Sequence, residues 1–181
     1  GKPLPQTAAW ARFDASITHP HPCCQDVNSL FVMALVKAVE EGPEPAELYG
    51  YILAQAEEPE ILPVVVKAVR EASQEPPPDL TKKQGWVLLA FQNALWQLRR
   101  GADPETALAD TISRGGDTDT NAAICGALLG AVWGLKSIPD QWQEKVLSCQ
   151  PKKGNPAIIH PRPEIFWPGE ALTLAEKLLN G

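Results

Sequence analysis

Apolar residues recur every three or four positions along most of the chain, whereas the alternating pattern of a half-buried strand is almost absent. This periodicity predicts an all-α fold. The 181 residues match the length of one domain, so we expect residues 1–181 to form a single domain, a compact bundle of helices. The spacing predicts helices at 25–41, 45–58, 60–72, 85–100, 104–114, about 117–136, around Trp142, and 171–180.

Two of these helices should be largely buried. The segment 85–100 is apolar on nearly every side, so it should cross the centre of the fold. The helix over 117–136 carries Gly126, Gly130 and Gly134 at a spacing of four. Glycine costs about 1 kcal/mol in a helix interior, so this row predicts a neighbouring backbone in close contact. We therefore expect this second helix to be the most buried one.

Charge and composition exclude several classes of function. The net charge is −6, which leaves no basic surface for nucleic acid or for an anionic membrane. No apolar run approaches the roughly 20 residues that span a bilayer, so the sequence predicts a soluble protein. The four cysteines have neither the spacing of a disulfide framework nor that of a zinc site. We expect reduced thiols and a cytoplasmic location.

The segment "SRGGDTDTNAAICGALLGAVWG" concentrates oxygen-bearing side chains between two helices. A single aspartate or threonine at a helix start is often only a cap. Asp117, Asp119 and Thr120 provide three such side chains within four residues, and carboxylate and hydroxyl oxygens are ligands that Mg²⁺ prefers. Gly115 and Gly116 would let a ligand approach the backbone without a Cβ clash. The pattern favours a metal site over caps alone.

The stretch "GGDTDTNAAICGALLGAVWG" resembles the C-terminal signature of the ADP-ribosylglycohydrolases, which include the activator of dinitrogenase reductase and the ADP-ribosyl-acceptor hydrolases. Three more segments are similar to parts of that family, namely "SITHPHPCCQD", "GWVLLAFQNALW" and "IPDQW". The resemblance implies an all-α, metal-dependent hydrolase that cleaves the glycosidic bond between ADP-ribose and a protein side chain or a related acceptor. Its substrate would be an ADP-ribosylated protein or a small molecule that contains ADP-ribose.

The resemblance also implies roles for individual residues. Asp117, Asp119 and Thr120 would bind two Mg²⁺ or Mn²⁺ ions, and Gly115 and Gly116 would lie against the substrate. By the same resemblance, Gly85 would lie near the adenosine, although a helix with Trp86 can equally be part of the core. His19 would lie near ADP-ribose and donate to a ribose or phosphate oxygen, whereas its sequence alone is also that of a loop residue.

One part of the family pattern is missing. Family members carry a Thr-Asp-Asp motif on the N-terminal side, and no such motif precedes Thr18 here. The chain therefore looks like the C-terminal portion of the fold, with an incomplete metal site and an unidentified catalytic residue. We expect it to need an N-terminal segment of the same fold or a second copy. The alternative is a non-catalytic protein that binds ADP-ribose or has a structural role and retains the fold.

Overall fold

The computed structural model describes residues 3–180 and contains helices but no strand within that range, which confirms the all-α prediction. None of its helices is long and apolar enough to cross a membrane. The chain forms two compact units, one up to Ser137 and one from Ile138 onward. Whether residues 1–181 behave as a single domain stays a prediction.

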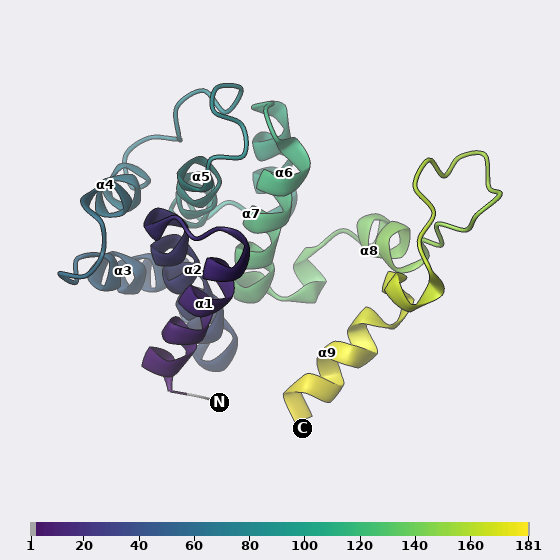
Figure 1. The fold of residues 1–181 in the computed structure, drawn as a ribbon, viewed down its shortest axis with the longest axis horizontal. Coiled ribbons are helices and arrows are strands. Elements are labelled where there is room, and N and C mark those ends of the chain that lie inside the picture. The colour runs from purple at the N-terminus through teal and green to yellow at the C-terminus, as the bar shows by residue number, and fades with distance from the viewer. Residues whose placement is uncertain (1–2, 181) are drawn as a thin grey trace. The chain divides into compact units, whose positions relative to one another are not determined.

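The first unit contains seven α-helices and a short 3₁₀ helix (Figure 1). Prolines define several of the helix starts, because α2, α3, α4 and α6 each begin at a proline, whose fixed φ suits the first helical turn. The elements are α1 (Leu4–Thr18), α2 (Pro22–Glu41), α3 (Pro45–Ala56), α4 (Pro63–Glu71), α5 (Val87–Arg99), α6 (Pro104–Ser113), α7 (Thr118–Trp133) and η1 (Leu135–Ser137).

Helix α5 forms the centre of this unit, as its sequence predicts, and packs against α2, α3, α4 and α7. Its buried positions include three polar residues, Gln92, Asn93 and Gln97, beside apolar ones such as Phe91 and Leu95. Asn93 donates to Thr111 Oγ1 on α6 at 2.9 Å. Polar contacts therefore join α5 to α6.

The burial predicted for α7 is wrong. Only one face of α7 is buried, through Asn121, Cys125, Leu128 and Leu129, so α5 and not α7 is the most buried helix. The predicted backbone contact at the glycine row is also wrong. A Cβ at Gly126 would meet only the side chain of Leu108, and those at Gly130 and Gly134 would meet no heavy atom within 4 Å among the described residues.

Helix α1 is not among the helices that the sequence predicts. It packs on α2, and one of its contacts is an ion pair between Arg12 and Asp26. Asp26 also accepts a hydrogen bond from the backbone N–H of Leu62 at 2.9 Å, just before α4 begins. Asp26, near the start of α2, thus joins α1 to the start of α4.

The second unit contains α8 (Asp140–Leu147), η2 (Glu164–Phe166), η3 (Pro168–Glu170) and α9 (Ala171–Asn180). None of the side chains described in it is buried. Helix α8 packs against η3, and Trp167 Nε1 donates to the carbonyl oxygen of Arg162 at 3.0 Å. This unit is held by local contacts rather than by a buried core.

Candidate functional site

The turn between α6 and α7 and the residues just before α5 line one open depression of about 430 Å³. Four of the residues predicted for the site meet there, although they come from two separate segments of the chain. They are Gly85, Gly116, Asp117 and Asp119, together with Gln84 and Thr118. The structure thus brings the predicted aspartates beside the predicted adenosine-side glycine.

The backbone conformation of the turn requires glycine at two adjacent positions. Gly115 and Gly116 both have left-handed φ angles, 74° and 76°, which side chains other than glycine rarely tolerate. A Cβ on Gly116 would overlap the backbone carbonyl of Leu80, with the carbonyl carbon only 2.7 Å away. A Cβ on Gly115 would lie 3.3 Å from Thr81 Cγ2. The glycine pair therefore lets the connection before α5 pack directly on the turn that carries the aspartates.

The carboxylate of Asp117 does not act as a helix cap. Asp117 occupies the N-cap position of α7, yet its side chain makes no capping hydrogen bond. Asp119 Oδ1 instead accepts the backbone N–H of Thr120 at 2.9 Å. The neighbouring Asp117 side chain and this backbone N–H lower the pKa of Asp119. Both aspartates thus line the depression, and the Asp117 side chain makes no capping hydrogen bond to α7.

The third predicted metal ligand lies apart from this lining. Thr120 is exposed and is not among the residues that line the depression. In the described part of the chain, no group of three or more histidine, cysteine, aspartate or glutamate side chains is placed to hold a metal ion. Asp117 and Asp119 suit a hard cation chemically, but they provide only part of a full ligand set.

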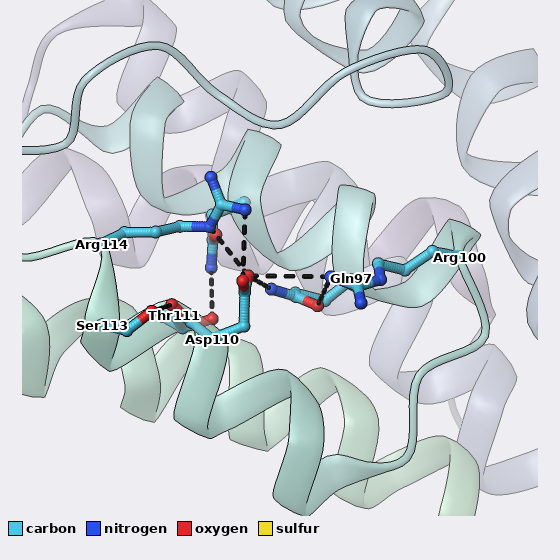
Figure 2. A network of polar contacts seen from close by, with 7 residues as sticks. Gln97, Arg100, Asp110, Thr111, Ser113 and Arg114 are labelled. Atoms are coloured by element: carbon cyan, nitrogen blue, oxygen red, sulfur yellow. Dashed lines mark hydrogen bonds and ion pairs between the residues drawn. The ribbon is translucent and has the colours of Figure 1, made fainter.

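A polar network fixes the end of α6, directly before the turn (Figure 2). Asp110 accepts hydrogen bonds from Arg114 Nε at 2.8 Å and from Gln97 Nε2 at 2.6 Å, and Arg100 lies 3.8 Å away. The guanidinium groups of Arg100 and Arg114 lie 4.5 and 4.6 Å from the ring centre of Trp96. Because Arg114 precedes Gly115, the network holds the start of the turn on α5.

The two histidines of "ITHPHP" have different surroundings. His19 is exposed, and its Nδ1 lies 2.9 Å from Thr18 Oγ1; it is not among the residues that line the depression. His21 Nδ1 accepts the backbone N–H of Cys23 at 3.1 Å and so caps α2. The His21 ring also meets Trp86 edge-to-face, with centroids 5.7 Å apart. His21 therefore contacts the residue next to Gly85, and the role of His19 stays a prediction.

Sequence reasoning missed two lining residues, Gln84 and Thr118. Each is a direct neighbour of a predicted site residue, so position in the sequence was the available signal. Thr118 stands between the two aspartates, and Gln84 precedes Gly85. Neither residue type is distinctive without the fold that brings the two segments together.

The sequence is similar to a protein family and to several characterised proteins. A family model described as ADP-ribosylglycohydrolase matches residues 1–177. The ADP-ribosylhydrolase ARH3 of Bos taurus is 44% identical over 46 residues, which are 25% of this chain and 12% of that protein. The ADP-ribosylarginine hydrolase Tri1 of Pseudomonas putida is 31% identical over 72 residues, 40% of this chain and 19% of that protein.

A third relative is the ADP-ribosyl-[dinitrogen reductase] glycohydrolase of Rhodospirillum rubrum. It is 40% identical over 42 residues, which are 23% of this chain and 14% of that protein. No solved structure matches the chain. From the aligned shares, the chain is about half as long as the bovine and Pseudomonas relatives.

Proposed function

The chain belongs to the ADP-ribosylglycohydrolase family, and on this basis we propose that it supplies the C-terminal half of a hydrolytic site for ADP-ribosyl linkages. The bond cleaved would be the glycosidic bond between ADP-ribose and a protein side chain or a related acceptor. The observation that carries this proposal is the pair Asp117 and Asp119. Both line one open depression, and the Asp117 side chain makes no capping hydrogen bond.

We propose that Asp117, Asp119 and Thr120 hold two Mg²⁺ ions, for which Mn²⁺ could substitute. Both aspartates line the same depression, and carboxylate and hydroxyl oxygens are the ligands that Mg²⁺ prefers. Such ions, when bound, orient and polarise the oxygens of the ribose and the pyrophosphate. The remaining ligand positions would be filled by water and by residues outside this chain.

The other residues of the depression would position the substrate. Gly116 lines the depression and would meet the substrate with its backbone, whereas Gly115 is not among the lining residues and would act by shaping the turn. Gln84 and Gly85 also line the depression, and the Gln84 amide can donate to and accept from a ribose hydroxyl. His19 would donate to a ribose or phosphate oxygen, which requires its exposed ring to turn toward the bound ligand.

The partner of this half-site would be an N-terminal segment of the same fold or a second copy. Two octahedral ions about 3.5–4 Å apart need more oxygen ligands than two carboxylates and one hydroxyl provide. The isolated chain should therefore show no appreciable turnover. The substrate would be an ADP-ribosylated protein or a small ADP-ribose compound, and a reducing compartment such as the cytoplasm fits the four free thiols.

The test is calorimetric titration of Mg²⁺ into the chain assembled with the N-terminal segment of a family member. Asp117→Asn and Asp119→Asn should each weaken Mg²⁺ binding at least tenfold, a change of about 1.4 kcal/mol, with little effect on the fold. Asp103→Asn is the matched control, because Asp103 is an N-cap that does accept a backbone N–H, from Thr106 at 3.0 Å. It removes the same charge outside the depression and should leave Mg²⁺ affinity unchanged.

Equal Mg²⁺ affinity in the wild type and in both site variants would contradict the metal assignment. Turnover of an ADP-ribosylated substrate by the assembled protein would favour a hydrolase over a non-catalytic protein that retains the fold. Binding of ADP-ribose without turnover would favour the non-catalytic protein instead.

A further inference from the structure

A second concavity lies next to the depression and shares none of its lining residues. It is a groove of about 470 Å³ between α4, the connection that includes Lys82 and Lys83, and the first turns of α5. We call it the α4–α5 groove. Its apolar walls include Val64, Trp86 and Leu89, and three lysines and Gln92 also line it. Lys83 and Trp86 directly flank Gln84 and Gly85 of the depression, so the two concavities are neighbours.

Gln92 is the unusual residue of this groove. Its residue surface is 5% exposed, and its side chain makes no hydrogen bond with any described residue. The two neighbouring buried amides on α5 have structural partners, since Asn93 donates to Thr111 and Gln97 donates to Asp110. The polar atoms of the Gln92 amide are not fully buried. Among the described residues, the fully buried side-chain atom without a hydrogen-bond partner is Asn93 Oδ1, which belongs to the next residue. A largely buried amide that lines a groove and has no hydrogen-bond partner is suited to a ligand.

The charges of the groove favour an anion. Lys67 pairs with Glu71 and Lys82 with Asp79, each at 3.5 Å, and these pairs are largely exposed. Exposed ion pairs are weak and exchange readily. Lys83 has no ion-pair partner among the described residues and lies in the left-handed region with φ 54°. Three ammonium groups therefore face two carboxylates, on a chain whose net charge is −6.

We propose that the α4–α5 groove binds an acidic segment of polypeptide. The amide of Gln92 both donates and accepts, which matches the N–H and C=O of a peptide group. The apolar walls suit the carbon atoms of an extended chain, and the lysines suit glutamate or aspartate side chains. If the proposed function is correct, this segment is the protein part of an ADP-ribosylated substrate, since the groove adjoins the depression. Binding of the acidic segment itself does not depend on that function.

The test measures binding of a short fluorescein-labelled peptide that alternates glutamate with alanine, by fluorescence anisotropy with the 181-residue chain. Lys83→Asn removes the unpaired charge, and asparagine tolerates the left-handed backbone; it should weaken binding about three- to fivefold. Gln92→Leu keeps the side-chain volume and should weaken binding about five- to tenfold. Lys37→Gln, which removes a lysine outside the groove, should leave binding unchanged.

A second readout separates a binding role for Gln92 from a structural one. Gln92→Leu should keep or raise the melting temperature, because it removes a buried polar group without a partner. A lowered melting temperature together with unchanged peptide binding would overturn the proposal. Equal binding of a peptide in which glutamine replaces glutamate would also overturn it, as would displacement of the peptide by a single-stranded oligonucleotide. If the chain binds the peptide but not ADP-ribose in its assembled form, only the proposed function fails.

Discussion

The backbone carbonyl of Leu80 packs directly on Gly116, so closely that a Cβ on Gly116 would lie 2.7 Å from the carbonyl carbon and closer still to its oxygen. This contact joins the connection before α5 to the turn that carries Asp117. A tertiary contact therefore holds this turn in place.

Gly116→Ala should lower the free energy of unfolding by about 2–3 kcal/mol, because the new methyl group meets backbone and because φ is 76°. Urea denaturation measures the change. Gly130→Ala is the control, since a Cβ there meets no heavy atom within 4 Å and lies inside α7. That substitution should raise stability by about 1 kcal/mol. Equal stability of the Gly116→Ala variant and the wild type would mean that Leu80 moves freely.

Asp110→Asn should destabilise the chain by about 1–3 kcal/mol near neutral pH. Burial opposes ionisation of this carboxyl group, but hydrogen bonds from Arg114 and Gln97 outweigh it and hold the pKa of Asp110 below its usual value. A carboxyl group with a lowered folded pKa stabilises the fold above its unfolded pKa of about 3.9 and loses this effect as pH falls through the folded value. The difference between wild type and variant should thus be constant above about pH 5 and shrink as the pH falls from there through the folded pKa in urea titrations. A difference that does not shrink would rule out the charge as its source.

His21→Ala should change the stability of the fold, whereas His19→Ala should change the binding of ADP-ribose. His21 caps α2 and contacts Trp86, so its loss should lower the free energy of unfolding by about 1–2 kcal/mol. His19 is exposed, and its replacement should leave stability unchanged while weakening ADP-ribose binding in the assembled protein. Thermal denaturation and calorimetry measure the two effects. An unchanged ADP-ribose affinity in the His19→Ala variant would mean that His19 is an ordinary loop residue with no role in binding.

The four thiols should react with a thiol reagent in a fixed order. Cys149 is exposed and should react first, followed by the half-buried Cys24. Burial raises the pKa of both Cys23 and Cys125 to about 11, so little thiolate is available near neutral pH. These two should react only as the fold opens. Time-resolved labelling followed by peptide mass spectrometry gives the order, and early labelling of Cys125 would contradict the packing of α7 on α5.

Helix boundaries were the part of the fold most easily predicted from sequence, because prolines and glycines act locally. The helix predicted at 104–114 begins at Pro104, where Asp103 caps it, and ends at Ser113. Helix α1 was missed because its apolar residues, such as Trp10 and Phe13, surround the helix without a clear stripe, and both are exposed. The burial of α7 was overestimated because small residues on all sides imitate a buried helix, whereas only one face packs.

The candidate site was predictable only in part for a related reason. Asp117, Asp119 and the glycine pair lie in one short segment whose composition signals a special turn. The contact of Leu80 with Gly116 and the packing of His21 on Trp86 join distant segments, and periodicity carries no information about such pairs. The same limit hid the unpartnered amide of Gln92, since its neighbours Asn93 and Gln97 are the same kind of residue.

The buried carboxylate of Asp26 has a consequence for amide hydrogen exchange. The N–H of Leu62 lies at the start of α4, where backbone donors without helical partners usually exchange with solvent rapidly. Here it donates to Asp26, the same side chain that pairs with Arg12 of α1. Detachment of α1 would expose this carboxylate to water and release the Leu62 amide, so the exchange rate at this single position reports the opening of a helix far away in the sequence.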